Sequence, residues 1–465
     1  MSRVIVVGGG LIGLATSLLI AKQGHDVTVL ERDPEPPPKT PQEATASWAR
    51  PGVMQFRLVN FLLPRGRQLL DEHLPEVTAL LAASGASSHN GLGDLPPGVT
   101  DRAARPGDER FATLATRRQL LEYAMATVAE PAVDVRRGTQ VTGLLSDGRR
   151  RVTGVQLRGS ELPADLVIDA SGRRSPLPGW LAAIGADVPV EESEDLGFVY
   201  YGRFFQGPAD AGRPLPIPAG LFHYDCYSVL VLPSDTGTWS ATIVLSGRDH
   251  ALRGLREEAS FTKLISACPM HAPILNLRPI TGMLAAAGIS DRVRPLAIST
   301  APVVTGLLAV GDSWACTNPS LGRGVSVGLL HALATAEAVG AHLDDPVALA
   351  VEHDRLTRKR VLPWYRATTQ VDRQRAAQVA AAIEGRPPPP APASPEVQVV
   401  QDVSAAMMVD ADAFRAFLEL TFMLALPDDL VSRPGFAAHV KNIAAALPPA
   451  RFPGPTRQEL LAMLS

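Results

Sequence analysis

The stretch from Val4 to Gly13 constrains the fold of this chain more than any other. Its first four residues are apolar and β-branched, which predicts a strand buried on both faces. Gly8, Gly10 and Gly13 follow at G-x-G-x-x-G spacing, and an apolar segment then continues to Ala21. This spacing lets the chain turn tightly, lets a pyrophosphate approach the backbone and lets a helix pack closely on the strand. The amides at the start of that helix face the phosphates.

A second apolar segment, Asp26 to Leu30, predicts another buried strand, which ends at Glu31. An acidic side chain at this point accepts hydrogen bonds from the ribose of an adenosine. Strand, glycine turn, helix and acid together predict a dinucleotide-binding unit. Two other interpretations fit less well. A signal peptide would begin with Arg3 and an apolar run, but four glycines interrupt that run. A glycine-rich turn that binds nothing would not need the strand and the acid.

The composition excludes several classes of partner. At 465 residues the chain is too long for one compact core, which predicts two or three domains. The net charge is −3 and no block of Lys or Arg occurs, so neither nucleic acid nor an anionic membrane surface is expected as a partner. The 3 cysteines lie far apart without a C-x-x-C pair, so we expect no metal site and a cytoplasmic location. Beyond the first turn we expect no apolar stretch of about eighteen residues, and hence no transmembrane segment.

Two later motifs belong to the same half of the fold. The segment Leu166 to Ile168 predicts a short buried strand, and D-A-S-G follows it at residues 169–172. The segment Gly306 to Val310 predicts another, followed by G-D-S and then by N-P-S-L-G-R-G at residues 318–324. The glycines of this last run open a helix, so the chain has a second helix start that a ligand can approach. Its amides can face an electron-rich ring edge.

The sequence changes in character between residues 181 and 295, where strands rich in aromatic and β-branched residues are expected. Alternation from Trp239 to Leu245 predicts an antiparallel sheet with one buried face. We expect this sheet to form a substrate-side domain inserted into the nucleotide-binding fold. The predicted strands are Phe198 to Phe205, Leu221 to Leu232, Trp239 to Leu245 and Leu275 to Met283.

Prolines divide the predicted helices. The pattern from Pro64 to Leu81 breaks at Pro75, and that from Pro346 to Ile383 breaks at Pro363. The proline-rich run at residues 386–395 predicts an extended connector. The remaining expectations are a surface loop or lid over residues 84–108, a helix over Thr116 to Val128, a hairpin over Val133 to Val155, and three amphipathic helices over residues 400–465, the first with Met407, Met408, Phe414, Phe417 and Leu418 near one face.

The three separated motifs together resemble those of the FAD-dependent monooxygenases of the para-hydroxybenzoate hydroxylase type, especially the epoxidase and hydroxylase branch of secondary metabolism. The resemblance covers residues 1 to about 375 and adds R-P-G-V at Arg50, T-R-R-Q-L-L-E around Arg118 and P-W-Y…D-R near Trp364. It implies an α/β fold: a Rossmann-like FAD-binding domain of the glutathione-reductase type, an inserted antiparallel β-sheet substrate domain and a C-terminal helical region. The implied division is 1–180 for the first part of the FAD-binding domain, 181–295 for the substrate-binding sheet, 296–345 for the last part of the FAD-binding domain and 346–465 for the helical region.

The resemblance also assigns cofactor contacts. Glu31 would bind the adenosine ribose, Arg118 would reach the phosphate or ribityl region, and Asp312 would bind the ribityl or pyrophosphate part. Val141 would offer its backbone to the adenine, and Arg323 would suit the negative charge of the reduced ring. The implied FAD-binding residues are Gly8, Gly10, Leu11, Ile12 and Gly13 at the pyrophosphate, Glu31 with Arg32 beside it, Arg50, Arg118, Val141, Asp312, and Pro319, Gly322, Arg323, Gly324 and Val325 at the isoalloxazine.

The resemblance leaves the electron donor open. This chain reads A-S-G at residues 170–172, where many members have A-D-G, a run associated with FAD and nicotinamide contacts. NAD(P)H is therefore expected to reduce FAD either directly or through a separate flavin reductase. Flavin halogenases share the architecture, but their W-x-W-x-I-P motif is absent and no lysine lies between Lys39 and Lys263. Halogenation is therefore disfavoured.

The activity that the resemblance implies is oxygen insertion. One atom of O₂ would pass through a flavin C4a-hydroperoxide to a lipophilic alkene or aromatic substrate, as epoxidation or hydroxylation. This chemistry requires no Ser-His-Asp set or carboxylate pair, and no side chain is identified as catalytic. His223 and His331 are expected mainly as packing residues. Two alternatives stay open: a flavin-dependent reductase or dehydrogenase of an alkene, as in relatives that carry D-A-S-G, and a non-redox flavin-binding cyclase.

Overall fold

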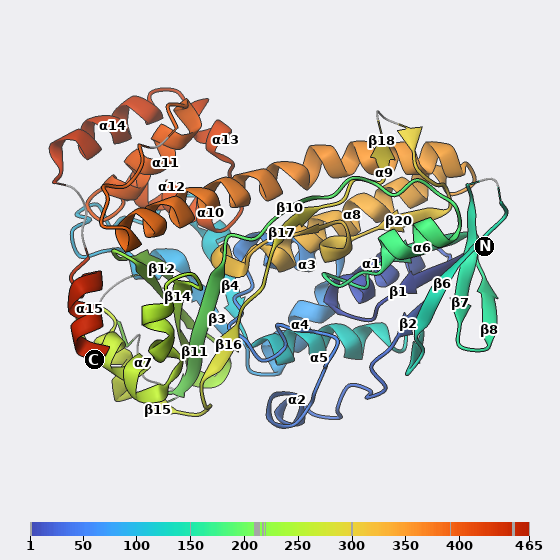
Figure 1. The fold of residues 1–465 in the computed structure, drawn as a ribbon, viewed down its shortest axis with the longest axis horizontal. Helices are drawn as coiled ribbons and strands as arrows, with labels where there is room; N and C mark the ends of the chain where they lie inside the picture. The colour runs from blue at the N-terminus through green and yellow to red at the C-terminus, as the bar shows by residue number, and fades with distance from the viewer. Residues whose placement is uncertain are drawn as a thin grey trace.

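The computed structural model describes residues 2–464 except 149, 209–213, 216–217, 219, 299–300, 391 and 449–451. Figure 1 shows a parallel sheet in the part that carries the N-terminus and an antiparallel sheet in the part that carries the C-terminus. Long helices run along the molecule between them. The fold is thus the expected α/β arrangement with a second, antiparallel sheet.

The parallel sheet combines β20 (Leu307–Ala309), β9 (Leu166–Asp169), β1 (Arg3–Val7), β2 (Asp26–Glu31) and β5 (Asp134–Arg137), in this order within the described chain. The carboxyl ends of parallel strands lie at one edge. From β1 the strand order continues toward β2 on one side and toward β9 on the other. The edge beyond β1 is therefore a topological switch point, the place where ligands bind in open α/β sheets.

Both faces of β1 are buried, as its run of β-branched residues predicts. Two of its residues pack into one hydrophobic cluster with α1 (Leu11–Ala21) and α8 (Gly324–His342). The two that alternate with them pack into a second cluster with the hairpin of β6 (Val141–Ser146) and β7 (Val152–Leu157). The first strand is therefore the centre of the part that carries the parallel sheet.

The prediction of a hairpin over Val133 to Val155 is wrong for the first of its two strands. Residues 134–137 form β5, which pairs with β2 in the parallel sheet. The hairpin consists of β6 and β7 instead and continues into β8 (Ser160–Pro163). A strand pattern does not tell which distant strand completes a sheet, because that pairing depends on tertiary structure.

The antiparallel sheet has one face against α7 (Glu258–Ser266) and the other toward α10 (Leu362–Ile383). Three predicted strands are confirmed, the second of them divided in two by residues 224–226. The fourth, Leu275 to Met283, is wrong except at two residues, because it starts within a 3₁₀ turn. The strands run in the order β12 (Gly220–His223), β13 (Tyr227–Pro233), β14 (Thr238–Ser246), β11 (Phe198–Gln206) and β15 (Arg278–Pro279), with β16 (Leu284–Ala286) also paired to β11.

Both predicted proline breaks are confirmed. Helix α3 (Pro64–His73) is followed at once by α4 (Pro75–Ala83), and α9 (Pro346–Arg360) is followed by α10. Pro363 lies in the first turn of α10, where its missing N–H leaves no helical bond unmade. Helix α10 extends from the parallel-sheet part to the antiparallel sheet, so it ties the two parts together (Figure 1).

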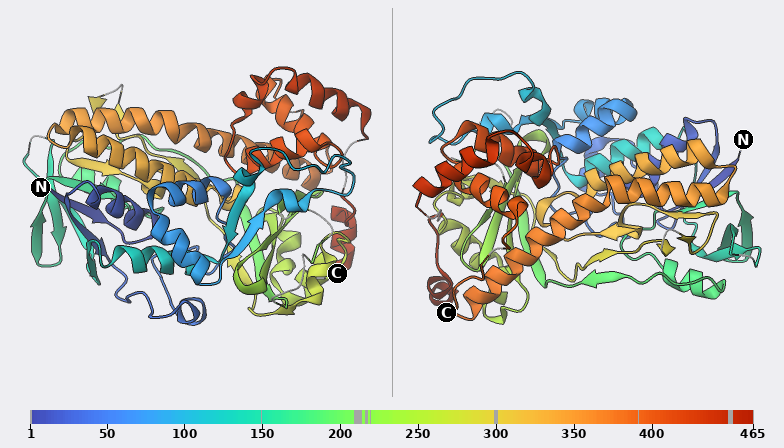
Figure 2. Two further views of the ribbon diagram at one scale, coloured as in Figure 1. Left: turned by 180° about the vertical axis from the view of Figure 1, so that it is seen from behind. Right: turned by 90° about the horizontal axis from the view of Figure 1, so that it is seen from above.

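The C-terminal region differs from the three predicted helices. Asp410 accepts hydrogen bonds from the backbone N–H groups of Asp412 and Ala413, and this cap starts a new helix where one continuous helix was expected. The apolar residues expected on one helix face therefore come from two helices, with Met407 at the end of one and Phe414 on the next. Most of these helices gather in one lobe (Figure 2). Within the described residues they are α11 (Pro395–Ala406), α12 (Ala411–Thr421), α13 (Pro427–Val431), α14 (Phe436–Ala446) and α15 (Arg457–Leu464).

The segment 84–108, expected as a loop, is partly ordered into a strand. β3 (Ser87–Asn90) pairs with β4 (Ala112–Ala115), and the predicted helix after it is α5 (Arg118–Ala129). The remaining elements are α2 (Pro41–Ala46), α6 (Leu177–Ala183), the sheet of β10 (Glu192–Glu194), β17 (Asp291–Val293) and β21 (Ala315–Cys316), and the pair β18 (Ala297–Ile298) and β19 (Ala301–Pro302).

Helix α8 corrects the expectation that no apolar stretch reaches membrane-spanning length. It has 19 residues and a mean hydropathy of 1.3, which by length and composition suffices to cross a bilayer. However, 67% of the apolar window is buried within the protein, where α8 packs against α1, α3 and α9. A core helix has these properties as well.

We predict that Gly13→Ala lowers the free energy of unfolding by about 2–3 kcal/mol, since a Cβ at this position would lie 1.9 Å from the carbonyl oxygen of Gly8. The matched control is Gly179→Ala in α6, where no described atom lies within 4 Å of the added carbon. This control changes stability by less than about 1 kcal/mol, in the stabilising direction. Urea unfolding of both variants measures the difference, and equal effects would contradict the prediction.

Candidate cofactor and substrate sites

The glycine turn after β1 combines two packing glycines with one open position. A Cβ at Gly8, whose φ is +109°, would lie 2.5 Å from the carbonyl oxygen of Ala170. A Cβ at Gly13 would strike Gly8, as noted above. Around a Cβ at Gly10, in contrast, the described residues leave open space to 4 Å. The open backbone at Gly10, just before α1, is the cradle that a pyrophosphate requires.

The second glycine-lined helix start lies beside the first. Gly322 and Gly324 are exposed at the start of α8, and no described atom lies within 4 Å of a Cβ on either. Ile12 of α1 joins the two starts, because a Cβ at Gly311 would lie 3.2 Å from it and a Cβ at Gly328 only 2.5 Å. The chain therefore leaves backbone open at two adjacent helix starts, and this arrangement fits an elongated dinucleotide such as FAD.

A buried charge cluster lies where the ribose-binding acid was predicted. Glu31 Oε2 accepts hydrogen bonds from the backbone N–H of Gly9, at 2.8 Å, and from Arg50 Nη2, at 2.7 Å. Glu31 Oε1 accepts from the N–H of Asp33 at 2.9 Å. A carboxylate has about four acceptor positions, so Glu31 can still accept from a ribose hydroxyl.

Arg50 is the cation shared by this cluster. Its side chain is fully buried, and its Nε donates to Asp33 Oδ2 at 3.2 Å. Its Nη1 has no hydrogen-bond partner in the described structure and lies 3.9 Å from Glu122 Oε2, which also lacks one. Burial works against the charged guanidinium, but Glu122, Glu31 and Asp33 outweigh it and raise the pKa of Arg50. These two unpartnered buried atoms are further groups that a polar ligand can satisfy.

Arg118 and Asp312 approach the same region from different parts of the chain. Arg118 donates to Glu122 Oε1 from both Nε and Nη2, at 2.9 and 2.6 Å. Burial raises the pKa of Asp312, against the opposing charges of Arg118, Arg173 and Arg292. The charge of Arg118 therefore acts on Asp312, although the two predicted residues lie far apart in the sequence.

Two other predicted contacts lie on the ribose side. The N–H of Thr139 donates to the carbonyl of Glu31 at 2.9 Å, which holds the start of β6, and thus Val141, beside the end of β2. Arg32 is exposed next to Gly52. Val141 itself is buried in the cluster that covers β1.

Asp169, the acid of D-A-S-G, forms hydrogen bonds that hold the loop following β9. Asp169 is fully buried, and its Oδ1 accepts from the N–H and the hydroxyl of Ser171, while its Oδ2 accepts from the hydroxyl of Ser175. The N–H of Gly172 donates to Ser313 Oγ at 2.9 Å, which links this loop to G-D-S. Both carboxylate oxygens of Asp169 therefore accept hydrogen bonds from serine side chains of the same loop.

Arg323 is directed away from the helix start toward the C-terminal helices. Its Nη1 donates to Thr368 Oγ1 at 3.1 Å and its Nη2 to the carbonyl of Leu420 at 2.8 Å. Burial lowers its pKa to about 10, so the guanidinium stays charged at neutral pH. Its neighbours Pro319 and Val325 are half-buried and buried at the same turn.

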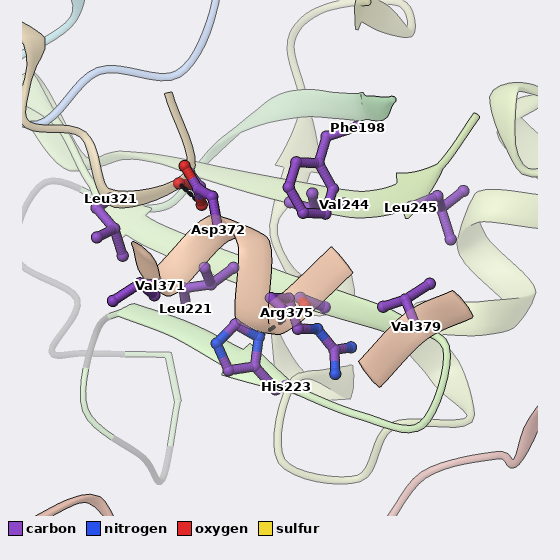
Figure 3. A pocket seen from close by; sticks show the side chains of 12 residues that line it. Phe198, Leu221, His223, Val244, Leu245, Leu321, Val371, Asp372, Arg375 and Val379 are labelled. Atoms are coloured by element: carbon purple, nitrogen blue, oxygen red, sulfur yellow. Dashed lines mark hydrogen bonds between the residues drawn. The ribbon is translucent and has the colours of Figure 1, made fainter. Parts of the chain in front are cut away.

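An apolar cavity adjoins this turn, between the antiparallel sheet and α10 (Figure 3). The space it encloses is about 20 Å³, enough for about one water molecule. The lining combines many aliphatic side chains with a few polar ones. They are Phe198, Leu221, His223, Ser228, Val244, Leu245, Ser320, Leu321, Val371, Asp372, Arg375 and Val379.

Sequence reasoning missed several polar residues of these sites. Glu122 could have been found, because it lies four residues after Arg118 in T-R-R-Q-L-L-E and both residues share one helix face. Asp33 and Arg292 carried no comparable local signal. Asp372 was overlooked within the proline-divided helix, where a single acid gives no indication of burial. His331, expected as a packing residue, accepts the N–H of Gly311 at 3.1 Å.

The parallel sheet, the two adjacent glycine-lined helix starts and the buried charge cluster define a Rossmann-like FAD-binding flavoprotein. The family comparison agrees, since the model of the FAD dependent oxidoreductases (DAO) matches residues 3–339. The chain belongs to this family.

Individual relatives are distant. Protein Rv3254 of Mycobacterium tuberculosis is 26% identical over 389 residues, which cover 77% of each chain. Among solved structures, the myxobacterial chondrochloren halogenase CndH is 18% identical with a TM-score of 0.59, over 94% of this chain and 99% of its own. PqsL, a probable FAD-dependent monooxygenase from Pseudomonas aeruginosa, is 18% identical with a TM-score of 0.56, over 83% of this chain and 99% of its own. At these identities the likeness concerns the fold alone.

Arg50→Met is expected to lower the free energy of unfolding by about 3–5 kcal/mol near neutral pH, because it leaves Glu31 and Asp33 buried without their shared cation. The control is Arg32→Met, an exposed arginine beside Gly52, which changes stability by less than about 0.5 kcal/mol. Urea unfolding of the FAD-free protein measures both. A small effect of Arg50→Met would mean that the cluster does not depend on this cation.

Gly10→Val is expected to separate cofactor binding from folding. The backbone at Gly10 is extended, with φ −79° and ψ 177°, and the Cβ would enter open space, so stability should change by less than about 0.5 kcal/mol. The two methyl groups of the valine would occupy the path of the pyrophosphate, and FAD affinity should fall at least about tenfold. Fluorescence titration with FAD measures this loss, and undiminished affinity would place the cofactor elsewhere.

Proposed function

We propose that this protein is an FAD-dependent monooxygenase of the para-hydroxybenzoate hydroxylase type that inserts one oxygen atom from O₂ into a lipophilic substrate, by epoxidation or hydroxylation. The observation that carries this proposal is the position of the apolar cavity. Ser320 and Leu321 line it and also belong to the turn that opens α8, where the isoalloxazine is expected. The apolar side chains at this turn would then face a substrate held at the reactive edge of the ring.

Bound FAD, once reduced by two electrons and two protons, would supply the redox chemistry, in which one atom of O₂ enters the substrate and the other leaves as water. The residues of the chain hold the reactants. The open amides at Gly10 and the start of α1 would receive the pyrophosphate, and Glu31 the adenosine ribose. Arg118 and Asp312 would contact the middle of the cofactor.

The chain also limits access of water to the reaction. Aliphatic side chains such as Leu321 and Val244 cover the cavity, and a dry site protects reactive species from hydrolysis. Arg323 bonds to α10 and to the end of α12, so it fixes the start of α8 against the helices that close this side.

We further propose that NAD(P)H supplies the electrons, directly or through a separate flavin reductase. The complete burial of Asp169 favours the second route, because a fully buried acid cannot reach a nicotinamide. Location in the cytoplasm and the division at residues 180, 295 and 345 remain predictions. The absent W-x-W-x-I-P motif argues against halogenation, although CndH shares the fold.

The test uses the FAD-loaded protein with NADPH and a flavin reductase, under ¹⁸O₂, with styrene and 2-naphthol as probe substrates. We expect styrene oxide or a hydroxylated naphthol that carries one ¹⁸O atom and no product under anaerobic conditions. Reduction of styrene without O₂ would support the reductase alternative, and conversion by oxidised FAD without a donor would support a cyclase. A brominated product in the presence of bromide would contradict the exclusion of halogenation.

A further inference from the structure

One buried histidine connects the two parts of the candidate cofactor site. His331 of α8 is fully buried, and its Nδ1 accepts a hydrogen bond from the backbone N–H of Gly311 at 3.1 Å. Gly311 is the buried first residue of the G-D-S turn, and the half-buried Asp312 follows it directly. A buried backbone N–H without an acceptor costs free energy, so Nδ1 supplies what the turn needs at this point.

The position of His331 on α8 explains how its side chain reaches the turn. Gly324, Gly328 and His331 lie at spacing i, i+4, i+7 and therefore share one face of the helix. Ile12 of α1 packs between this face and the turn, because a Cβ at Gly328 would lie 2.5 Å from it and a Cβ at Gly311 3.2 Å. The hydrogen bond thus joins the turn to the helix whose start is expected beside the isoalloxazine.

The other hydrogen bonds that hold the turn come from different elements. Arg292 of β17 donates to the carbonyl of Asp312 at 3.1 Å, and Arg294, just beyond that strand, donates to the carbonyl of Ser313 at 3.3 Å. The D-A-S-G loop donates to the hydroxyl of Ser313, as described above. Among the described residues, the hydrogen bond to His331 is the one that connects the turn with α8.

The contacts of the ring determine its tautomer. Because Nδ1 accepts, the neutral ring carries its proton on Nε2, which donates to Thr357 Oγ1 of α9 at 3.2 Å. The ring of His353 stacks on that of His331, with centroids 5.3 Å apart. Burial, together with His353, lowers the pKa of His331 well below its usual value. Near neutral pH, Nδ1 therefore carries no proton and can accept the N–H of the turn.

We propose that His331 is a positioning residue for the cofactor, which holds the G-D-S turn through Gly311 so that Asp312 can bind the ribityl or pyrophosphate part of FAD. This inference rests on the contact between Asp312 and FAD that the proposed function includes. A residue that only filled the space between α8 and α9 would need no acceptor at Nδ1. The two ring nitrogens have separate partners, so substitutions can separate their roles.

The test uses two substitutions that each retain one of these partners. In His331→Asn the amide oxygen stands near the place of Nδ1 and can accept from Gly311, while the bond to Thr357 is lost. In His331→Gln the amide N–H₂ stands near the place of Nε2 and can donate to Thr357, while Gly311 loses its acceptor. The matched control is Thr357→Val, which removes the same hydrogen bond as His331→Asn and keeps the histidine.

Two quantities are measured without an electron donor, so neither depends on oxygen chemistry. Fluorescence titration of the FAD-free protein gives the dissociation constant of FAD. Hydrogen exchange followed by mass spectrometry gives the exchange rate of the Gly311 N–H, from fragments that end on either side of it. Urea unfolding of each variant shows how much stability is lost, so that a change in FAD affinity can be compared with it.

We expect His331→Gln to weaken FAD binding at least about tenfold and to accelerate exchange of the Gly311 N–H, since one buried hydrogen bond is lost. His331→Asn and Thr357→Val should bind FAD within about threefold of the wild type, although both lower the urea midpoint. In the wild type, the Gly311 N–H should be protected before FAD is added, because His331 and not the cofactor holds it.

Equal FAD affinities of His331→Gln and His331→Asn, or an unprotected Gly311 N–H in the FAD-free wild type, would overturn the proposal. If His331→Gln does not fold, an affinity of His331→Asn more than about tenfold below that of the wild type would overturn it as well. Asp312→Ala separates the two proposals. Unchanged affinity in Asp312→Ala would refute the contact between Asp312 and FAD and this inference with it, whereas weakened affinity there with none in His331→Gln would refute this inference alone.

Discussion

Close backbone packing around Ile12 is the constraint on which the rest of this structure depends. The side chain lies between Gly311 and Gly328, where a Cβ would come within 3.2 and 2.5 Å of it. Because glycine stands at both positions, α1 and α8 can start side by side at the carboxyl edge of the parallel sheet. The G-x-G-x-x-G turn and the later G-D-S turn thus belong to one site, although about 300 residues separate them.

A cluster of buried charged side chains is the second feature of this site. Glu31, Asp33 and Glu122 surround one buried guanidinium, that of Arg50, and Glu122 is shared with Arg118. Such a cluster is costly to desolvate and strongly destabilised when one member is removed. It therefore contributes more to the shape of the site than to net stability. It fixes the loop that carries Arg50 against the end of β2, and it leaves two polar atoms available to a ligand.

Local sequence signals predicted most helices and strands, but they did not predict which strands pair with one another. The period of the apolar residues and the prolines located β1, α1, the breaks at Pro75 and Pro363 and most strands of the antiparallel sheet. They did not reveal that residues 134–137 join the parallel sheet, since strand pairing is decided by distant segments. They also did not reveal the cap at Asp410 that divides the C-terminal helices. For the site, the motifs identified the residues at strand ends and helix starts, while Arg323 is held away from the turn by α10 and α12.

The sequence by itself determined that a glycine turn follows a buried strand and that a second strand ends in an acid, because these features lie within 31 residues and depend on local sterics and helix geometry. Tertiary structure alone decided that Asp372 lies in an apolar cavity beside Ser320, and that Arg50 serves three carboxylates. Those properties arise from desolvation and from contacts between segments far apart in the chain, and no short pattern of residues encodes them.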